Sequence, residues 1–293
     1  MSSTNDHMQA PMVARTINEV RQQVNIWKQA GDKIAFVPTM GNLHAGHLNL
    51  IKAASKSASR VVVSVFVNPM QFGEGEDFDT YPRTFDADMS ALSKYTVDMV
   101  FVPAVAEIYP ENIENATFVE VPKLSEILEG EHRPGFFIGV ATVVNKLFNI
   151  VQPDVAIFGE KDFQQLLVIR QMVHDLAMPI EIQSVATQRD VNGLAMSSRN
   201  GYLDEEELIL APALHCCMEH VVEVIVAGEN PTYEVGHAYQ ELDEKGFLVD
   251  YIVVRRQQDL AVPEKGDKSL IVLAAARLGS VRLIDNIPFE LME

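Results

Sequence analysis

The sequence predicts an α/β protein with a Rossmann-like parallel-sheet domain followed by a smaller α/β C-terminal cap domain. Short apolar runs alternate with segments of helical spacing from about residue 14 to residue 186, which favours a parallel sheet with right-handed crossovers. Beyond residue 186, two long helical stretches precede three apolar runs, which is more typical of an antiparallel sheet. We therefore expect a disordered tail over residues 1–13 and domains over 14–186 and 187–293.

The first domain opens with a helix, because Thr16 and Glu19 have the spacing of a capping box and an apolar stripe follows that ends at Gly31. The continuous β-branched run over 61–67 is typical of a strand buried on both faces. The other expected strands cover 34–37, 97–102, 117–121, 155–158 and 180–186. The other expected helices cover 44–58, 84–95, 124–128, 140–151 and a segment beginning at Asp162.

The second domain is expected to begin with a long helical stretch over 204–226, whose acidic start suits a helix N-terminus. A helix over 233–244 and strands over 250–254, 270–275 and 281–284 follow.

Composition excludes several functional classes. The 293 residues are 47% hydrophobic and 22% charged, as in ordinary globular proteins, and the net charge of −18 argues against a nucleic-acid partner. The N-terminus lacks the apolar core of a signal peptide, and no apolar run reaches the roughly 18 residues of a membrane span. The only cysteines are the neighbours Cys216 and Cys217, which fits a reducing compartment. We expect a cytoplasmic protein with no membrane partner.

The stretch over 36–47 indicates an anion-binding turn. An apolar strand ends at Pro38, and a glycine-containing loop leads to His44 and His47 at the start of a helix. Gly41 permits backbone conformations closed to other residues, and a helix N-terminus attracts anions. The two histidines lie one turn apart on the same helix face, where they could hydrogen-bond a phosphate. Two other interpretations remain: a zinc pair, which needs a third ligand that no cluster supplies, and histidines that only cap or pack the helix.

Two further loops carry candidate phosphate ligands. Lys161 follows Gly159 at a strand end and can reach a phosphate as a point charge, while Asp162 could cap a helix or accept from a ribose hydroxyl. Gln165 is four residues beyond Lys161, on the same helix face. The stretch over 189–200 contains two serines and an arginine, which can grip a polyphosphate, and it falls at the domain junction. For each loop the alternative is an ordinary solvated turn or helix cap.

The loop after the second strand holds the amides Asn68 and Gln71, either of which could orient a hydroxyl or a carboxylate. Asp86 and Asp88 follow, and they fit the first turn of a helix better than a metal site.

Six segments together resemble the pantothenate synthetase (pantoate–β-alanine ligase) family. They are 38–47 (PTMGNLHAGH), 66–72 (FVNPMQF), 81–84 (YPRT), 139–144 (GVATVV), 158–165 (FGEKDFQQ) and 193–200 (GLAMSSRN). The His-x-Gly-His pattern alone marks only the wider nucleotidyltransferase superfamily, whereas the full set in this order is specific to the family.

The resemblance implies an ATP-dependent, AMP-forming carbon–nitrogen ligase of pantothenate biosynthesis. ATP, with Mg²⁺ on its phosphates, would react with pantoate to give pantoyl adenylate and pyrophosphate. The amine of β-alanine would then attack the activated carbonyl and release pantothenate and AMP. The family also implies a homodimer.

The resemblance assigns roles to individual residues. The catalytic group comprises His44, His47, Lys161, Ser197 and Arg199, with His47 as proton donor. The ATP-binding set comprises Met40, Gly41, Asn42, Leu43, His44, Ala45, Gly46, His47, Gly159, Glu160, Lys161, Asp162, Gln188, Met196, Ser197, Ser198 and Arg199. Pantoate would contact Pro38, Met40, Gln71 and Gln165, and β-alanine would contact Gln71. No protein metal site is expected.

The chain departs from the family pattern at Gln188, where valine is common and the main chain meets adenine. Asn192 replaces a usual aspartate, and the Phe137-Ile138 pair lacks the arginine of a common variant. Two alternatives to the ligase remain. One is a nucleotidyltransferase that stops after transfer to a phosphorylated acceptor, and the other is a nucleotide-sensing module without turnover.

Overall fold

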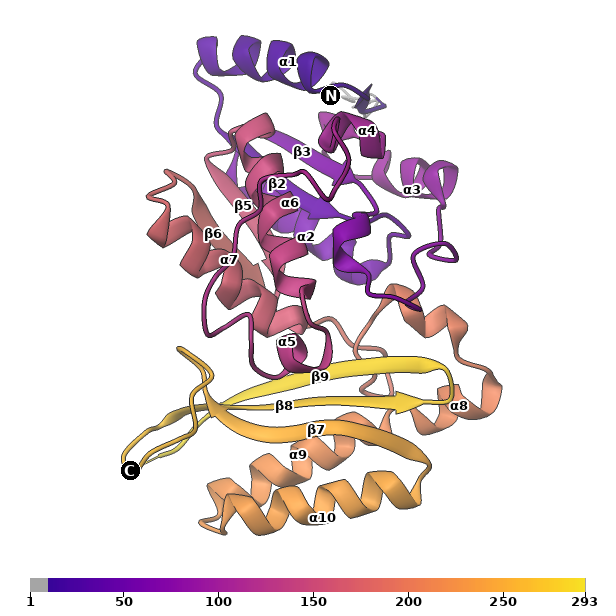
Figure 1. Ribbon diagram of the computed structural model, residues 1–293, viewed down its shortest axis with the longest axis vertical. Coiled ribbons are helices and arrows are strands. Elements are labelled where there is room, and N and C mark those ends of the chain that lie inside the picture. The colour runs from indigo at the N-terminus through magenta and orange to yellow at the C-terminus, as the bar shows by residue number, and fades with distance from the viewer. Residues whose placement is uncertain (1–9, 293) are drawn as a thin grey trace, which may run out of the picture. The chain divides into compact units, whose positions relative to one another are not determined.

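The computed structural model describes residues 10–292, which form two compact units, each with its own sheet (Figure 1). The first unit runs to Gly159 and resumes over Val168–Val185. The second unit combines Glu160–Leu167 with Ala186–Glu293.

The first unit contains a six-stranded sheet in which every neighbouring pair is parallel, in the order β1-β4-β3-β2-β5-β6. Its strands are β1 (Met12–Ala14), β2 (Ile34–Thr39), β3 (Arg60–Val65), β4 (Met99–Phe101), β5 (Val155–Gly159) and β6 (Glu181–Val185). The chain winds outward from β2 through β3 and β4 and returns to the other side of β2 with β5. This makes the gap between β2 and β5 a topological switch point, where such sheets bind ligands beyond the strand ends. The Rossmann-like prediction is confirmed.

Helices and short turns connect these strands. They are α1 (Ile17–Gln29), α2 (Ala45–Ser57), η1 (Pro69–Gln71), α3 (Phe85–Leu92), α4 (Val105–Ile108), α5 (Glu129–His132), α6 (Phe136–Val151), η2 (Glu160–Asp162) and α7 (Phe163–Asp175). The predicted capping box at the start of α1 is present, with Glu19 N–H donating to Thr16 Oγ1 and Thr16 N–H donating to Glu19 Oε2. α7 begins in the second unit and ends in the first.

The strands bury both faces, because alternate side chains point to opposite sides of a sheet. Val37 belongs to the core cluster that also contains Leu50 and Ile51 of α2. Phe36, one residue earlier, packs its ring edge against Phe148 of α6, with ring centroids 6.3 Å apart. Continuous apolar runs are therefore required in these strands, which explains why they could be recognised from the sequence.

The second unit contains an antiparallel sheet in the order β7-β8-β9, as predicted. Its elements are η3 (Ser198–Tyr202), α8 (Glu205–Leu210), α9 (Ala213–Val226), α10 (Pro231–Glu244), β7 (Phe247–Arg256), β8 (Ser269–Leu278) and β9 (Val281–Glu290). The core of the unit forms where α9 and α10 pack on this sheet and bury Met218, Leu242 and Val272.

Within the described residues, the stretch Glu205–Val226 alone has the length and apolar character of a membrane span, with a mean hydropathy of 1.6. The long helical stretch predicted over 204–226 is present as two helices, α8 and α9, which two turn residues including Pro212 separate. Proline has no N–H to continue the hydrogen-bond ladder. Leu214, Met218 and Val221 of α9 lie in the core of the second unit, which accounts for the apolar composition.

Three predictions need correction. The predicted tail extends too far, because Met12–Ala14 pairs with β4; a three-residue strand is too short to show alternation. Residues 1–9 of that tail lie outside the described part. Residues 117–121 form no strand, since the N–H of Val119 donates to Thr142 Oγ1 at 2.8 Å instead of to a strand. The helix expected over 124–128 is a series of turns.

The chain divides between residues 185 and 186, close to the predicted boundary, but one earlier segment belongs to the second unit. Residues 160–167 group with the second unit, not with residues 14–159. The physical reason is a side-chain anchor, because the amide of Asn286 on β9 donates to the carbonyls of Glu160 and Lys161. The roles predicted for the two domains stay predictions.

Candidate active site

The turn after β2 is held in its conformation by a buried carboxylate. Gly41 and Asn42 have positive φ values of 84° and 51°, which glycine and asparagine tolerate best. The N–H groups of Asn42 and Leu43 donate to the two oxygens of Asp88 at 3.0 and 2.8 Å. A Cβ on residue 41 would come within 2.9 Å of Val65, so the turn requires glycine there. Asp88 does lie in the first turn of α3, as expected, but its carboxylate also fixes the turn that precedes the histidines.

The rings of His44 and His47 are in contact, with centroids 4.1 Å apart and planes tilted by 39°. His44 is the N-cap of α2, and its Nδ1 accepts from the N–H of Gly46 at 3.2 Å. His47 Nδ1 accepts from the N–H of His44 at 3.4 Å. The expectation that the two rings share one helix face is confirmed.

These two bonds define the tautomers. A neutral imidazole that accepts at Nδ1 carries its proton on Nε2, so both rings are Nε2–H donors. The main-chain N–H groups of His44 and Gly46 are bonded to the rings, so the rings add their own N–H groups to the donors of this turn.

The loop after β3 places Gln71 beside a buried asparagine. Asn68 is fully buried, and its Nδ2 donates to Gln71 Oε1 at 3.0 Å and to the carbonyl of Gly139 at 3.1 Å. The hydroxyl of Tyr109 donates to Asn68 Oδ1 at 2.8 Å. Burial raises the pKa of Tyr109 well above its usual value, so the hydroxyl keeps its proton at neutral pH. Because Oε1 of Gln71 accepts from Asn68, the amide of Gln71 presents its Nε2 hydrogens as donors.

Gly139 allows α6 to approach this loop closely. A Cβ at this position would overlap the carbonyl of Met70 and lie 3.1 Å from the N–H nitrogen of Gln71. Gly139→Ala is therefore expected to push η1 away from α6, to raise the KM for the acid substrate expected at Gln71, and to lower the free energy of unfolding by about 1–3 kcal/mol. Steady-state kinetics and urea unfolding measure the two effects.

Gly236→Ala in α10 is the matched control, because a Cβ there meets nothing within 4 Å. This control should stabilise the protein by about 0.5–1 kcal/mol and leave the KM unchanged. An unchanged KM in Gly139→Ala would contradict the proposed coupling of α6 to Gln71.

An ion pair holds the acidic loop that follows Gln71. The guanidinium of Arg133 donates to both oxygens of Glu76, at 2.7 and 2.6 Å, and to the carbonyl of Gln71 at 3.0 Å. The ring of Phe136 lies under the guanidinium, 3.8 Å from its carbon. Arg133 therefore connects the start of α6 to the segment that carries Gln71.

A cavity of about 290 Å³ borders the turn after β2. Met40, Gly41 and Asp88 line it together with residues 65–67, 82–85 and 102–105. Neither Pro38 nor Gln71 is among its lining residues, so of the predicted pantoate ligands it contains Met40 alone.

In the second unit, Lys161 lies in η2 at the start of α7. Its Nζ is 3.7 Å from Asp162 Oδ1, and its side chain is 20% exposed. Gln165 follows in the first turn of α7 and is half-buried.

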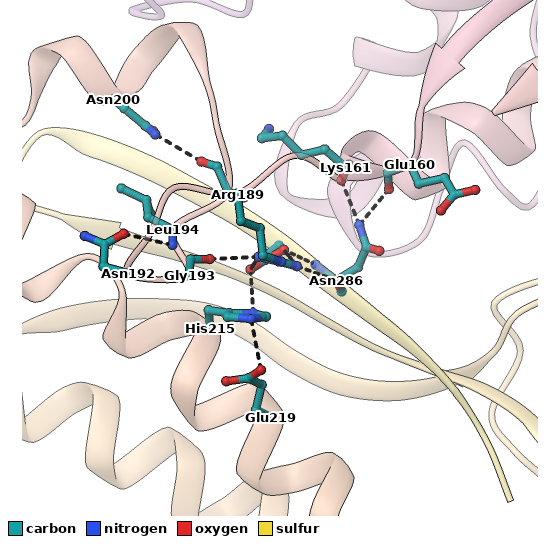
Figure 2. A network of polar contacts seen from close by, with 12 residues as sticks. Glu160, Lys161, Arg189, Asn192, Gly193, Leu194, Asn200, His215, Glu219 and Asn286 are labelled. Carbon is teal, nitrogen blue, oxygen red and sulfur yellow. Dashed lines mark hydrogen bonds and ion pairs between the residues drawn. The ribbon is translucent and has the colours of Figure 1, made fainter. Parts of the chain in front are cut away.

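The segment with the two serines begins with a small hairpin (Figure 2). Arg189 and Ala195 form an antiparallel bridge, and the N–H of Met196 donates to the carbonyl of Gln188 at 2.9 Å. Gly193 makes the turn with a φ of 93°, against the ring of His215. Ser197 then caps η3, since its Oγ accepts from the N–H of Arg199 at 3.2 Å. The capping interpretation is correct for Ser197, whose O–H still serves as a donor.

The structure thus arranges the predicted residues in two groups. In the first unit, the ends of β2 and β5 bring Met40–His47 and Gly159 to the switch point, and Pro38 pairs with Ser64 where β3 leads toward Gln71. In the second unit, β9 and its neighbours hold Glu160–Asp162 and the hairpin before Ser197. The described residues contain no group of three or more His, Cys, Asp or Glu side chains placed to hold a metal ion.

Sequence reasoning missed four supporting residues: Asp88 as a clamp, and Tyr109, Arg133 and Asn286. All four act through tertiary contacts 41 or more residues away in the chain, which spacing cannot reveal.

A Rossmann-like sheet with paired histidines at its switch point defines a nucleotide-binding α/β protein of the His-x-Gly-His class. Comparison with known proteins narrows this class. Residues 12–288 match the family model for pantoate-β-alanine ligase. A pantothenate synthetase of Shewanella loihica is 55% identical over 274 residues, which cover 94% of this chain and 97% of the relative. The chain belongs to the pantoate–β-alanine ligase family.

Solved structures agree with this assignment. A pantothenate synthetase from Thermus thermophilus superposes with a TM-score of 0.88 at 41% identity, covering 94% of this chain and 98% of that one. A pantoate-β-alanine ligase from Francisella tularensis, complexed with β-γ ATP and β-alanine, gives a TM-score of 0.79 at 35% identity, covering 95% and 97%.

Proposed function

We propose that this member of the family condenses (R)-pantoate with β-alanine to give pantothenate, AMP and pyrophosphate. The pantoate carboxylate attacks the α-phosphorus of ATP, and pyrophosphate leaves. The β-alanine amine then attacks the carbonyl of pantoyl adenylate, and AMP leaves. The observation that carries the proposal is the His44–His47 pair, whose ring centroids lie 4.1 Å apart and whose Nδ1 atoms each accept a main-chain N–H, in a chain that matches the family over residues 12–288.

The first step needs charge stabilisation more than covalent help. Negative charge grows on the phosphate oxygens as the bond to pyrophosphate breaks, and donors fixed before the reaction stabilise it without reorganisation. His44 and His47 supply such donors, because each ring is anchored at Nδ1 by a main-chain N–H. Lys161 and Arg199 add positive charge, and Ser197 and Ser198 add hydroxyl donors.

Around the nucleotide, the main chain of Met40–His47 and of Gly159–Asp162 contacts ATP, and Gln188 and Met196 flank the adenine. The carbonyl of Gln188 accepts from the N–H of Met196, and a carbonyl oxygen can accept two hydrogen bonds. The substitution of valine by glutamine is therefore compatible with a main-chain contact to adenine.

The acid substrate is bound by amides and apolar side chains. Gln71 donates through Nε2 to an oxygen of pantoate, and Gln165 supplies a second amide. Pro38 and Met40 pack on the pantoate methyl groups. Gln71 also contacts β-alanine, and the Francisella tularensis relative was solved with that ligand and β-γ ATP.

Three further properties complete the proposal. Mg²⁺ binds to the ATP phosphates, which it commonly prefers to a cage made only of protein ligands. The chain forms a homodimer, and it works in the cytoplasm.

Isotope exchange between pyrophosphate and ATP tests the function. Exchange is expected with pantoate and without β-alanine, because adenylate formation is reversible before the second substrate binds. Equal exchange without pantoate would indicate a different acceptor, and no exchange under any condition would indicate a nucleotide-binding protein without turnover.

A further inference from the structure

Asn286 on β9 anchors the main chain beneath Lys161 (Figure 2). Its Nδ2 donates to the carbonyl of Glu160 and to the carbonyl of Lys161, both at 2.8 Å. The residue is 3% exposed, so both bonds are shielded from water. One amide group therefore uses both of its hydrogens on two consecutive carbonyls of η2.

The same part of β9, Asp285 and Asn286, also binds the hairpin of residues 189–195. Arg189 donates to both oxygens of the neighbouring Asp285, at 2.6 and 2.9 Å. It further donates to the carbonyl of Asn286 at 3.2 Å and to that of Gly193 at 3.1 Å. In Figure 2 the side chain of Arg189 reaches the stretch of β9 beside Asn286 and also bonds to the carbonyl of Gly193.

The hairpin continues directly into the serine segment. Residue 195 is bridged to Arg189, and Ser197 follows two residues later as the cap of Arg199. Two loops about 30 residues apart in sequence, each with proposed phosphate ligands, are thus fixed to Asp285 and Asn286. The roughly 30 residues between the two loops do not by themselves fix the position of one loop relative to the other. A common anchor on β9 does so.

We propose that Asn286 is a positioning residue for adenylate formation, acting through the backbone that carries Lys161. This inference rests on the proposed contact of Lys161 with the ATP phosphates. The Lys161 ammonium stabilises developing charge only if it lies close to that charge. Displacement of η2 therefore destabilises the transition state more than the substrate complex. Asn286 itself touches no substrate in this scheme.

A double-mutant cycle tests the proposal by pantoate-dependent pyrophosphate exchange. Lys161→Ala alone should lower the exchange rate by about 10²-fold. Asn286→Ala alone should lower it by roughly 10-fold, with the KM for pantoate unchanged. If Asn286 acts through Lys161, the double variant should stay within about twofold of Lys161→Ala, because the ammonium is already gone.

Gln257→Ala is the matched control. Gln257 donates from one amide to the carbonyls of Leu270 and Phe289 in the same sheet, at 2.9 and 3.3 Å, without reaching η2. It should lose comparable stability in urea and keep the wild-type exchange rate. If Asn286→Ala does not fold, Asn286→Ser replaces it in the double-mutant cycle.

The possible outcomes distinguish failure of the proposed role of Lys161 from failure of the positioning role of Asn286. A wild-type rate in Lys161→Ala removes Lys161 from the proposed function and the positioning role with it. An impaired Lys161→Ala combined with an unimpaired Asn286→Ala, or with additive losses in the double variant, overturns the positioning role alone.

Discussion

His47→Ala is expected to lower the rate of pantoyl-adenylate formation by about 10²- to 10³-fold. The ring of His47 is held by the N–H of His44 at Nδ1, so its Nε2–H is a fixed donor for the phosphate that carries the growing charge. The loss should appear in the single-turnover rate, because a group that acts mainly in the transition state changes kcat more than substrate binding. Rapid-quench measurement of adenylate and pyrophosphate provides this rate.

The same substitution also removes half of the capping box of α2, which costs about 1 kcal/mol of stability. Thr16→Ala separates the two effects, because it breaks an equivalent capping box at α1. Both variants should lose similar free energy of unfolding, but only His47→Ala should lose adenylation. Near-normal single-turnover adenylation in His47→Ala would exclude His47 from the mechanism.

The sheet of the first unit could be predicted because its strands are buried on both faces. Residues such as Phe36 and Val37 pack on opposite sides, so the whole run must be apolar. The same signal is lacking in Met12–Ala14, which has only three residues. It is misleading at 117–121, where a side chain of α6 takes the hydrogen bond that a strand partner would supply.

The candidate site, like the sheet, contains features that the sequence could predict and features that it could not. Spacing alone placed His44 and His47 on one helix face, because three residues make nearly one turn. The spacing of the histidines in the sequence could not predict their tautomers, because these depend on which backbone N–H donates to each ring. It also gave no access to Asn286, because the contact with Lys161 joins residues 125 positions apart. Sequence motifs contain the residues that contact a ligand. The residues that hold those ligand-binding residues in place are dispersed over the chain, so motifs do not reveal them.

Asp285→Asn is expected to produce the largest loss of stability among these variants, about 3 kcal/mol near neutral pH. The carboxylate is 5% exposed and forms two bonds with Arg189, while His215 Nδ1 lies 3.3 Å from Oδ2 and Glu219 is 3.3 Å from the other side of that ring. Removing the charge leaves the guanidinium of Arg189, whose side chain is 21% exposed, without its counterion. Urea unfolding at neutral pH measures the loss.

Asp250→Asn is the matched control for this substitution. The pair of Asp250 and Arg282 lies in the same sheet, but Asp250 has a side-chain exposure of 21%. Its loss should be smaller than that of Asp285→Asn, because water reaches the Asp250 carboxylate in the folded protein. Equal losses in the two variants would contradict the role given to burial at Asp285.

The pH dependence gives the second signature of the ion pair at Asp285. Burial disfavours the charged form of Asp285, but the bonds from His215 and Arg189 outweigh it and lower the pKa of the carboxyl below its ordinary value of 3.8. A lowered folded pKa contributes stability above the unfolded pKa, and this contribution is lost as the pH falls through the folded pKa. The difference in unfolding free energy between wild type and Asp285→Asn should therefore narrow as the pH falls from about 5 toward 3. Urea unfolding across this range measures it, and a difference that widens between pH 5 and pH 3 would show that Asp285 is not the stabilising anion of the cluster.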